Sequence, residues 1–233
     1  MKVGTDAVLL GAWVNLNNVS RLLDIGTGSG VIAIMAAQRT THDCQIDGIE
    51  IQAPDCAQAT ANANASPWAQ RIRIVHTALQ DFHPPYRYDV IVCNPPYFIN
   101  SLQPPTNGRT TARHTVSLDH DALVTAVDRL LSPTGRASFI MPSEEGNQFR
   151  MDMKERAMQL TRITYFRSRR ERKIERFLMT FMRQSAVAND PIQVGGHNSK
   201  PILLETEVLL YEEGNRWTKD YTELTQDFYL TRP

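Results

Sequence analysis

Short apolar segments alternate with longer helical segments along the first 140 residues, and this alternation constrains the fold more than any other feature. Helical segments occupy residues 31–38, 54–65 and 120–131. The apolar segments, each about the length of a strand buried on both faces, are residues 22–25, 45–50, 71–76, 89–93 and 137–141. Repeated strand–helix units of this size favour a parallel sheet with right-handed crossovers and helices on both faces.

Two more strands are expected after a further helix that follows Asn147. They span residues 160–166 and 177–182, and their arginine-rich connection favours an antiparallel hairpin at one edge of the sheet. The expected fold is therefore α/β: a doubly wound, mostly parallel seven-stranded sheet with an antiparallel edge hairpin. At 233 residues, 42% of them hydrophobic, the chain can bury one large core, so residues 1–233 are expected to form a single domain.

Hydropathy and cysteine content argue against several protein classes. No run approaches the roughly 18 apolar residues that span a bilayer, and residues 1–6 lack the basic-then-apolar order of a secretory signal. Cys44, Cys56 and Cys93 show no CxxC spacing, which suits reduced, buried thiols. His114 and His120 are six residues apart, which suits no common metal spacing. We expect a cytoplasmic protein without membrane or metal partners, and a monomer is favoured.

A glycine-rich loop follows the first predicted strand. In such sheets ligands bind beyond the carboxyl ends of the strands, near the point where strand order reverses. Glycines 26, 28 and 30 would let the backbone turn tightly there, but Val31 stands where a dinucleotide-binding loop has its third glycine. Asp24 precedes the loop and suits a ligand with a positive ammonium group. Glu50 lies 20 residues beyond Gly30, where a carboxylate accepts hydrogen bonds from a ribose diol. Together they predict a site for a nucleoside that carries an amino acid.

The tetrad Asn94-Pro95-Pro96-Tyr97 follows the fourth predicted strand. The Asn94 side-chain oxygen and the rigidly held Pro95 carbonyl could each accept one N–H of an exocyclic amine, directing its lone pair at a methyl donor. Pro95 and Pro96 hold that carbonyl because proline fixes its own φ and restricts the preceding residue. Tyr97 offers a face on which a flipped base can stack. The tetrad predicts methyl transfer to a delocalised amino nitrogen.

Basic residues concentrate in the middle of a chain whose net charge is zero. Residues 101–186 hold 15 Lys and Arg against 9 Asp and Glu. Arg169 and Arg170 belong to the densest run, residues 167–176, which could neutralise phosphates or simply form a solvated hairpin. Residues 98–117 form a long aperiodic segment directly after the tetrad, and its Arg109 and Arg113 could reach phosphates beside a bound base.

The sequence resembles the bacterial tRNA1(Val) adenine-N6 methyltransferase family, within the class I S-adenosylmethionine (SAM)-dependent amino-group methyltransferases. Besides the glycine loop and the tetrad, the similarity rests on five stretches that cover nearly the whole chain: residues 2–6 (Lys-Val-Gly-Thr-Asp), 9–13 (Leu-Leu-Gly-Ala-Trp), 66–69 (Ser-Pro-Trp-Ala), 117–120 (Ser-Leu-Asp-His) and 224–230 (Leu-Thr-Gln-Asp-Phe-Tyr-Leu).

The resemblance implies a Rossmann-like fold, SAM as cofactor, and methylation of the tRNA adenine immediately 3′ of the anticodon. It places Thr5 near the methionine part of SAM, Glu50 on the ribose, and Asp81 near the cofactor's adenine amine. Phe82, which directly follows Asp81, is assigned to the cofactor site with it.

Two alternatives stay open from the residues alone. Protein glutamine N5-methyltransferases use the same Asn-Pro-Pro-Tyr tetrad on another delocalised nitrogen, but they carry an additional N-terminal helical domain for their protein substrate. An RNA-binding module on an inactive methyltransferase fold would need a damaged loop or tetrad, and both are intact here. The sequence therefore favours an active tRNA methyltransferase.

Overall fold

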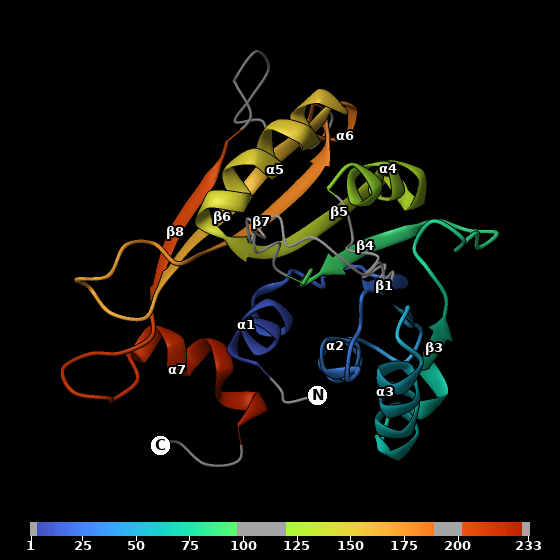
Figure 1. Cartoon of the computed structure of the whole chain (residues 1–233), viewed down its shortest axis with the longest axis horizontal. Helices are drawn as coiled ribbons and strands as arrows, with labels where there is room; N and C mark the ends of the chain where they lie inside the picture. The colour runs from blue at the N-terminus through green and yellow to red at the C-terminus, as the bar shows by residue number, and fades with distance from the viewer. Residues whose placement is uncertain (1–3, 97–119, 189–201, 230–233) are drawn as a thin grey trace, which may run out of the picture.

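Within the residues that the structure describes, 4–96, 120–188 and 202–229, one mixed sheet of eight strands forms the middle layer of the protein (Figure 1). This computed structural model gives the strand order β3-β2-β1-β4-β5-β7-β6-β8. The strands are β1 (Arg21–Ile25), β2 (Gln45–Glu50), β3 (Ile72–His76), β4 (Tyr88–Cys93), β5 (Leu131–Pro142), β6 (Met158–Arg167), β7 (Arg176–Arg183) and β8 (Leu204–Leu209).

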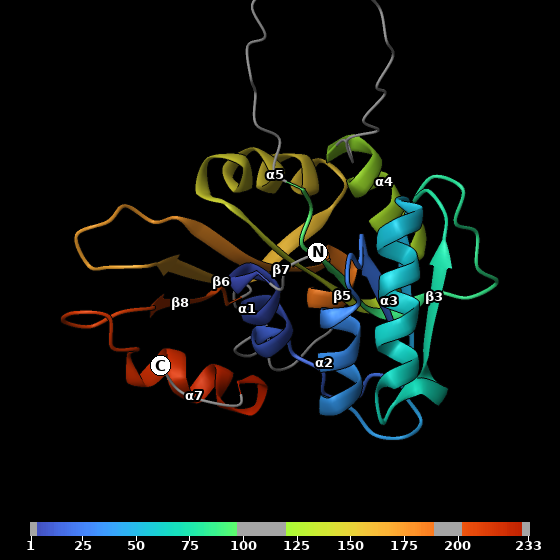
Figure 2. The ribbon, with the colours of Figure 1, turned by 60° about the horizontal axis from the view of Figure 1, so that its bottom comes forward.

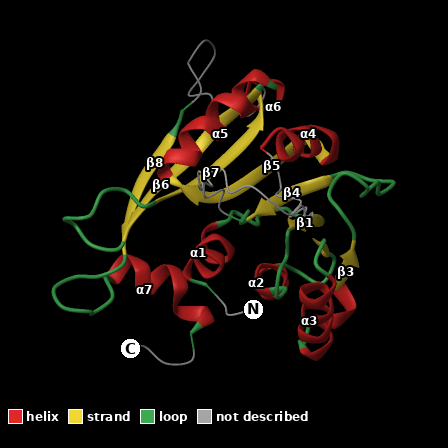
Figure 3. Cartoon of the chain, viewed as in Figure 1, coloured by secondary structure: helices red, strands yellow, loops and turns green. Residues whose placement is uncertain are grey.

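Helices cover both faces of this sheet, so the described part of the chain has three layers (Figure 3). One face carries α1, α2, α3 and α7, and the other carries α4 and α5 (Figures 1 and 2). The helices are α1 (Thr5–Trp13), α2 (Val31–Arg39), α3 (Ala53–Ala65), α4 (His120–Leu130), α5 (Ser143–Glu155), α6 (Gln184–Ala188) and α7 (Lys219–Thr225), with single 3₁₀ turns at Ala69–Arg71 and Gln226–Phe228. No helix in these ranges has the length and apolarity that crossing a membrane requires.

The central strands are parallel and are buried on both faces. In β4, Val90, Ile91, Val92 and Cys93 are fully buried, which explains why these strands appear in the sequence as continuous apolar runs. Strand order reverses at β1, since the chain leaves toward β2 on one side and returns at β4 on the other. This switch point is where sheets of this type bind ligands.

The hairpin of β6 and β7 is antiparallel, as predicted, and β7 is antiparallel to β5. The α/β class and the mostly parallel sheet are confirmed, but the sheet has one strand more than the seven expected. The extra strand, β8, pairs parallel to β6 on the outside of the hairpin. Its sequence, Leu-Glu-Thr-Glu-Val-Leu, gives a weak strand signal because most of its side chains are exposed and two are charged.

Helix α1, which the sequence did not predict, lies beside α2 and runs parallel to it. Val8 and Ala12 pack against Met35, and the Arg39 guanidinium at the end of α2 donates to the Gly11 carbonyl at 2.6 Å. Gly11 permits this approach because a Cβ there would lie 2.7 Å from the Met35 sulfur. Because the two helices are parallel, the first turn of α1 lies beside the start of α2.

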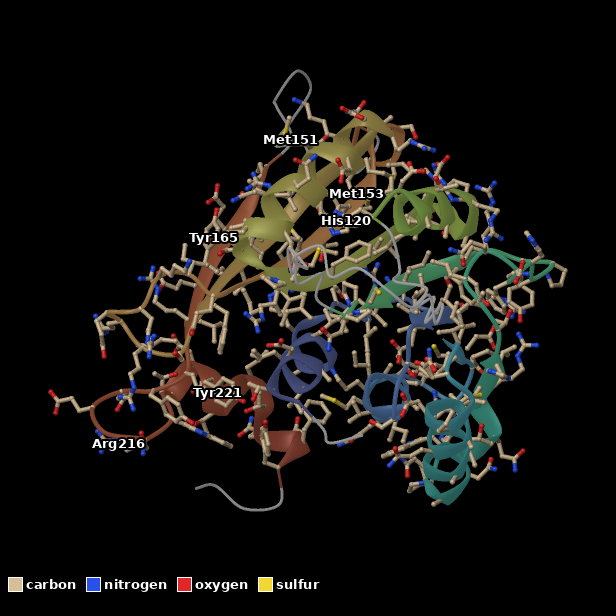
Figure 4. All side chains as sticks on the ribbon, in the orientation of Figure 1. His120, Met151, Met153, Tyr165, Arg216 and Tyr221 are labelled. Atoms are coloured by element: carbon tan, nitrogen blue, oxygen red, sulfur yellow. The ribbon has the colours of Figure 1, made fainter. Side chains whose placement is uncertain are left out.

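The C-terminal aromatic side chains form a packing stripe. Tyr221 is buried, its ring lies 5.1 Å from that of Trp217, and its hydroxyl lies 3.2 Å from that of Tyr229 (Figure 4). Leu224 and Phe228 pack against the cluster of Val8, Ala12 and Met35. Helix α7 thereby covers α1 rather than presenting its aromatic rings to a ligand.

Candidate active site

Strand register brings the predicted site residues to one edge of the sheet. Ile25 at the end of β1 is level with Ile49 on β2 and with Cys93 on β4. The glycine loop, Glu50 and Asn94 follow these three residues, so they lie next to one another at the carboxyl edge. The switch point therefore carries both the predicted cofactor residues and the described part of the tetrad.

Three glycines of the loop adopt backbone conformations that other residues rarely reach. The φ angles of Gly26, Gly28 and Gly30 are 67°, 56° and 80°, all in the left-handed region. Nothing lies within 4 Å of the position that a Gly26 Cβ would take, so the backbone there faces open space. A ligand can therefore approach the main chain closely.

Three amide groups of this loop donate hydrogen bonds within the protein. Thr27 N–H donates to the Ile49 carbonyl at 3.0 Å, Gly28 N–H to Glu50 Oε2 at 3.0 Å, and Gly30 N–H to the Thr27 carbonyl at 2.9 Å. A phosphate cradle needs amide groups that point at the ligand. With these three amides engaged and two carboxylates beside it, the loop is better suited to a cation than to a phosphate.

Asp24 is a buried carboxylate at the base of the loop. Its Oδ2 accepts a 2.6 Å hydrogen bond from Thr27 Oγ1, while its buried Oδ1 accepts none in the described residues. Burial raises the pKa of Asp24 from 3.8 to about 7. The Thr27 hydroxyl and the Ala33 main-chain amide oppose this shift, and the nearby Glu50 adds to it. An unsatisfied acceptor in such a place favours a positively charged or hydrogen-bond-donating ligand group.

Glu50 is held by two main-chain amides at the end of β2. Oε2 accepts from Gly28 N–H, and Oε1 accepts from Gln52 N–H at 2.9 Å. Each carboxylate oxygen has a second lone pair, so both can still accept a hydrogen bond from a ligand hydroxyl. The carboxylate is buried and fixed, as expected for a group that recognises a diol.

These residues fit SAM. Asp24 would face its cationic amino-acid part, Glu50 its ribose, and the open backbone at Gly26 its body. Thr5 is the first residue of α1, whose first turn lies beside the start of α2 and hence beside Gly30. When bound, SAM supplies an electrophilic methyl group on a sulfonium.

Asn94, Pro95 and Pro96 leave β4 as irregular backbone at the same edge. Asn94 is half-buried and Pro95 is buried. The part of the Asn94 side chain that is exposed can be reached by a substrate, as the predicted role requires. Tyr97, the last residue of the tetrad, lies outside the described residues.

Asp81 and Phe82 occupy a turn after β3 and differ in environment. Asp81 is exposed, so its carboxylate is accessible to a ligand. The Phe82 ring is packed in the core, 6.4 Å from the ring of Tyr88, and its carbonyl accepts a 2.7 Å hydrogen bond from Arg129. The Phe82 side chain therefore anchors the turn, and any contact of this residue with a cofactor would have to come from its main chain.

A cavity of about 780 Å³ opens beside the carboxyl end of β5, and sequence reasoning did not identify it. We call it the edge cavity. Its lining comes from the starts of α4 and α5 and from the part of the hairpin that leads into β7. It includes His120, Pro142, Glu145, Ile174 and Arg176. Its volume lies within the range of ligand sites. Strand β5 pairs with β4, and Asn94 directly follows β4. The edge cavity and Asn94 therefore lie at the ends of neighbouring strands, on the same edge of the sheet.

The two predicted RNA-binding arginines of the hairpin differ in their contacts. Arg169 donates to the Gly214 carbonyl at 2.7 Å and to the Asn215 side chain at 2.6 Å, and so ties the hairpin to the loop after β8. Arg170 is exposed. Arg109 and Arg113 lie outside the described residues.

Among the side chains that the structure does describe, no group of three or more His, Cys, Asp or Glu could hold a metal ion.

Comparison with known proteins first defines the class. Residues 3–165 match the family described as the methyltransferase small domain. In solved structures the fold is similar to that of a predicted O-methyltransferase from Agrobacterium tumefaciens, with a TM-score of 0.68 and 16% identity over 95% of this chain and 96% of that one. It is also similar to the glycopeptide N-methyltransferase MtfA in complex with SAM, with a TM-score of 0.58 and 13% identity over 78% and 89% of the two chains. The expected methyltransferase fold is thereby confirmed.

Curated relatives narrow the class. The chain is 37% identical over 230 residues to the tRNA1(Val) (adenine(37)-N6)-methyltransferase of Aliivibrio fischeri, covering 99% of this chain and 91% of that protein. The enzymes of the same name from Dyadobacter fermentans and Yersinia pestis are 37% and 36% identical, each over 99% of this chain and over 91% and 88% of their own lengths. The chain belongs to the tRNA1(Val) (adenine(37)-N6)-methyltransferase family, which confirms the resemblance drawn from its motifs.

The loop makes a testable prediction about cofactor choice. SAM and its demethylated product should bind, whereas NAD should not, because Val31 replaces the third glycine of a dinucleotide loop and three of the loop amides already donate within the protein. Titration calorimetry with each ligand measures this directly. Tight NAD binding without any response to SAM would contradict the assignment of the loop.

Proposed function

We propose that this protein transfers a methyl group from SAM to N6 of an adenine in tRNA, namely adenine 37 of tRNA1(Val), immediately 3′ of the anticodon. The observation that carries the proposal is the register that sets Asn94 and Pro95 after β4 beside the glycine loop after β1. The relatives named above share that activity by name and align with nearly the whole chain. The proposed place of action is the cytoplasm, where tRNA is modified.

The residues of the tetrad act as hydrogen-bond acceptors. Asn94 Oδ1 and the Pro95 carbonyl each accept one N–H of the adenine amine, which makes the nitrogen more pyramidal and points its lone pair toward the methyl group. Pro96 holds the Pro95 carbonyl in place because the residue before a proline is conformationally restricted. Tyr97 stacks on the flipped adenine. Asp24 and Glu50 hold the two ends of the cofactor, and no strong base is required.

A methylation assay tests the proposed function. The protein is incubated with labelled SAM and total tRNA from a strain that lacks the gene, and the modified nucleoside is mapped within the tRNA. The expected product is N6-methyladenine at position 37 of tRNA1(Val). A parallel incubation with protein extract in place of tRNA tests the N5-methyltransferase alternative, which the relatives do not favour; labelling of a protein glutamine there, with none of tRNA, would establish it. SAM binding without transfer to tRNA or to protein would leave only the RNA-binding alternative.

The hairpin arginines lead to a salt-dependence prediction. Arg170→Ala should lower the slope of log affinity for tRNA against log salt by about one, because an exposed guanidinium that contacts one phosphate releases about one counterion. Arg169→Ala should act mainly by loosening the loop at Gly214 and Asn215, with a smaller change in slope. Arg109→Ala with Arg113→Ala tests the second predicted patch in the same way. An unchanged slope would show that the substituted arginines do not contact RNA phosphates. SAM affinity, which should not change, serves as the control.

A further inference from the structure

Arg176 lies at the carboxyl edge of the sheet, beside the edge cavity. It is the first residue of β7, and its backbone is level with Pro142 at the end of β5. Because β7 is antiparallel to β5, the start of β7 lies at the carboxyl edge, beside the residues that follow β4. Its side chain lines the edge cavity.

The Arg176 side chain reaches from the edge cavity to α1. Its Nε donates to Asp6 Oδ2 at 3.0 Å, and its Nη1 donates to the Glu175 carbonyl at 2.9 Å. The Arg176 and Asp6 side chains are only 27% and 18% exposed, so solvent screens the pair less than a surface ion pair. The edge cavity is built by α4 and α5 on one face of the sheet, whereas α1 covers the other face (Figures 1 and 2). Arg176 thus joins the two faces across the edge.

The first turn of α1 has no side-chain cap. Gly4 is the N-cap of α1 and has no side chain with which to cap the helix, so the first turn lacks the hydrogen bond that Ser, Thr, Asp or Asn would give. Asp6 lies in that first turn, one residue after Thr5. Loss of the Arg176 contact is therefore expected to loosen this turn and with it the position of Thr5.

We propose that Arg176 is a positioning residue for methyl transfer, which fixes the first turn of α1 at the carboxyl edge of the sheet through Asp6. This inference rests on the proposed function for the use of that edge by SAM. Because Thr5 precedes Asp6 in the same turn, loss of the contact between Arg176 and Asp6 should weaken SAM binding.

A double-mutant cycle on SAM affinity tests the positioning role without tRNA. Arg176→Gln and Asp6→Asn should each weaken SAM binding about 5- to 30-fold in calorimetry, and the double variant should be no weaker than either single variant, since both remove the same contact. Arg176→Lys should recover part of the affinity because it restores the charge at Asp6. Independent, multiplying losses, or unchanged SAM affinity in both single variants, would overturn the proposal.

Arg183→Gln provides a matched control at the opposite end of the same strand. Arg183 pairs with Asp128 at 2.5 Å, far along β7 from the edge cavity, so its loss should lower thermal stability and leave SAM affinity unchanged. If wild type methylates no tRNA, the proposed function fails while the SAM cycle still decides the positioning role.

Discussion

Asn94→Ala is expected to lower the turnover number at least about 100-fold while SAM affinity stays within about twofold of wild type. Asn94 is half-buried at the carboxyl edge of the sheet, where a substrate can reach its side chain. The loss falls on the transition state, where Asn94 Oδ1 accepts from the amine as its lone pair turns to the methyl group. Single-turnover rates with saturating tRNA and SAM measure the chemical step separately from product release.

Two further variants sharpen this result. Asn94→Asp keeps an acceptor oxygen in the same place and should lose less than Asn94→Ala. Asn147→Ala, an exposed asparagine on α5, should leave turnover and SAM affinity unchanged. Near-native turnover of Asn94→Ala would refute the amine-activation role. Only the proposed cofactor-binding residues of the site would then remain.

The buried strands could be predicted from the sequence because burial on both faces leaves a continuous apolar run. The predicted bounds of β2 are the observed ones, and those of β1 and β4 differ by one residue at the start. The predicted strands also indicated the position of the site, since the glycine loop, Glu50 and Asn94 each lie at the carboxyl end of one of them. Helix α5 begins at Ser143, earlier than expected, because β5 ends at Pro142 and leads straight into it.

Two elements were missed for opposite physical reasons. In α1 every residue from Val8 to Trp13 is buried, so the helix shows no amphipathic period, and Gly4 gives no capping signal. In β8 the exposed and charged side chains hide the strand from a search for apolar runs. Both elements are defined by tertiary contacts that a local pattern does not contain.

The parts of the site that depend on contacts between distant residues were also beyond sequence reasoning. Asp6 and Arg176 are 170 positions apart, and neither carries a motif that points to the other. Phe82 follows a predicted ligand residue, yet its ring packs on Tyr88 in the core. The unusual protonation of Asp24 follows from its burial beneath the loop, which no spacing of residues reveals.

Asp24 is expected to make the stability of the protein and its affinity for SAM respond to pH in opposite directions. Its pKa is about 7 in the folded protein against an ordinary 3.8, so between these values the folded state holds a proton that the unfolded state does not. The stabilisation is therefore complete below pH 3.8 and is lost as pH rises through 7. The largest loss from this one group, for a carboxylate with no exposure, is roughly 4 kcal/mol.

A cation bound beside Asp24 favours the ionised carboxylate. SAM affinity should therefore rise as pH increases toward 7 and level off above it, with about one proton released per SAM bound near pH 6 and none above pH 8. Calorimetry in two buffers with different ionisation enthalpies counts the released protons. Equal proton counts at pH 6 and pH 8.5 would contradict the role given to Asp24.

Asp24→Asn separates the two effects in one variant. The amide keeps an oxygen that can accept from Thr27 Oγ1 but cannot ionise, so the folded protein no longer carries a buried charge at high pH. At pH 8.5 and without ligand, the variant should unfold at a higher denaturant concentration than wild type, by up to the roughly 4 kcal/mol above, and near pH 4 the two should be similar. Its SAM affinity should fall, and proton release near pH 6 should disappear. A variant that is less stable than wild type at pH 8.5 would show that Asp24 is ionised and satisfied in the folded protein.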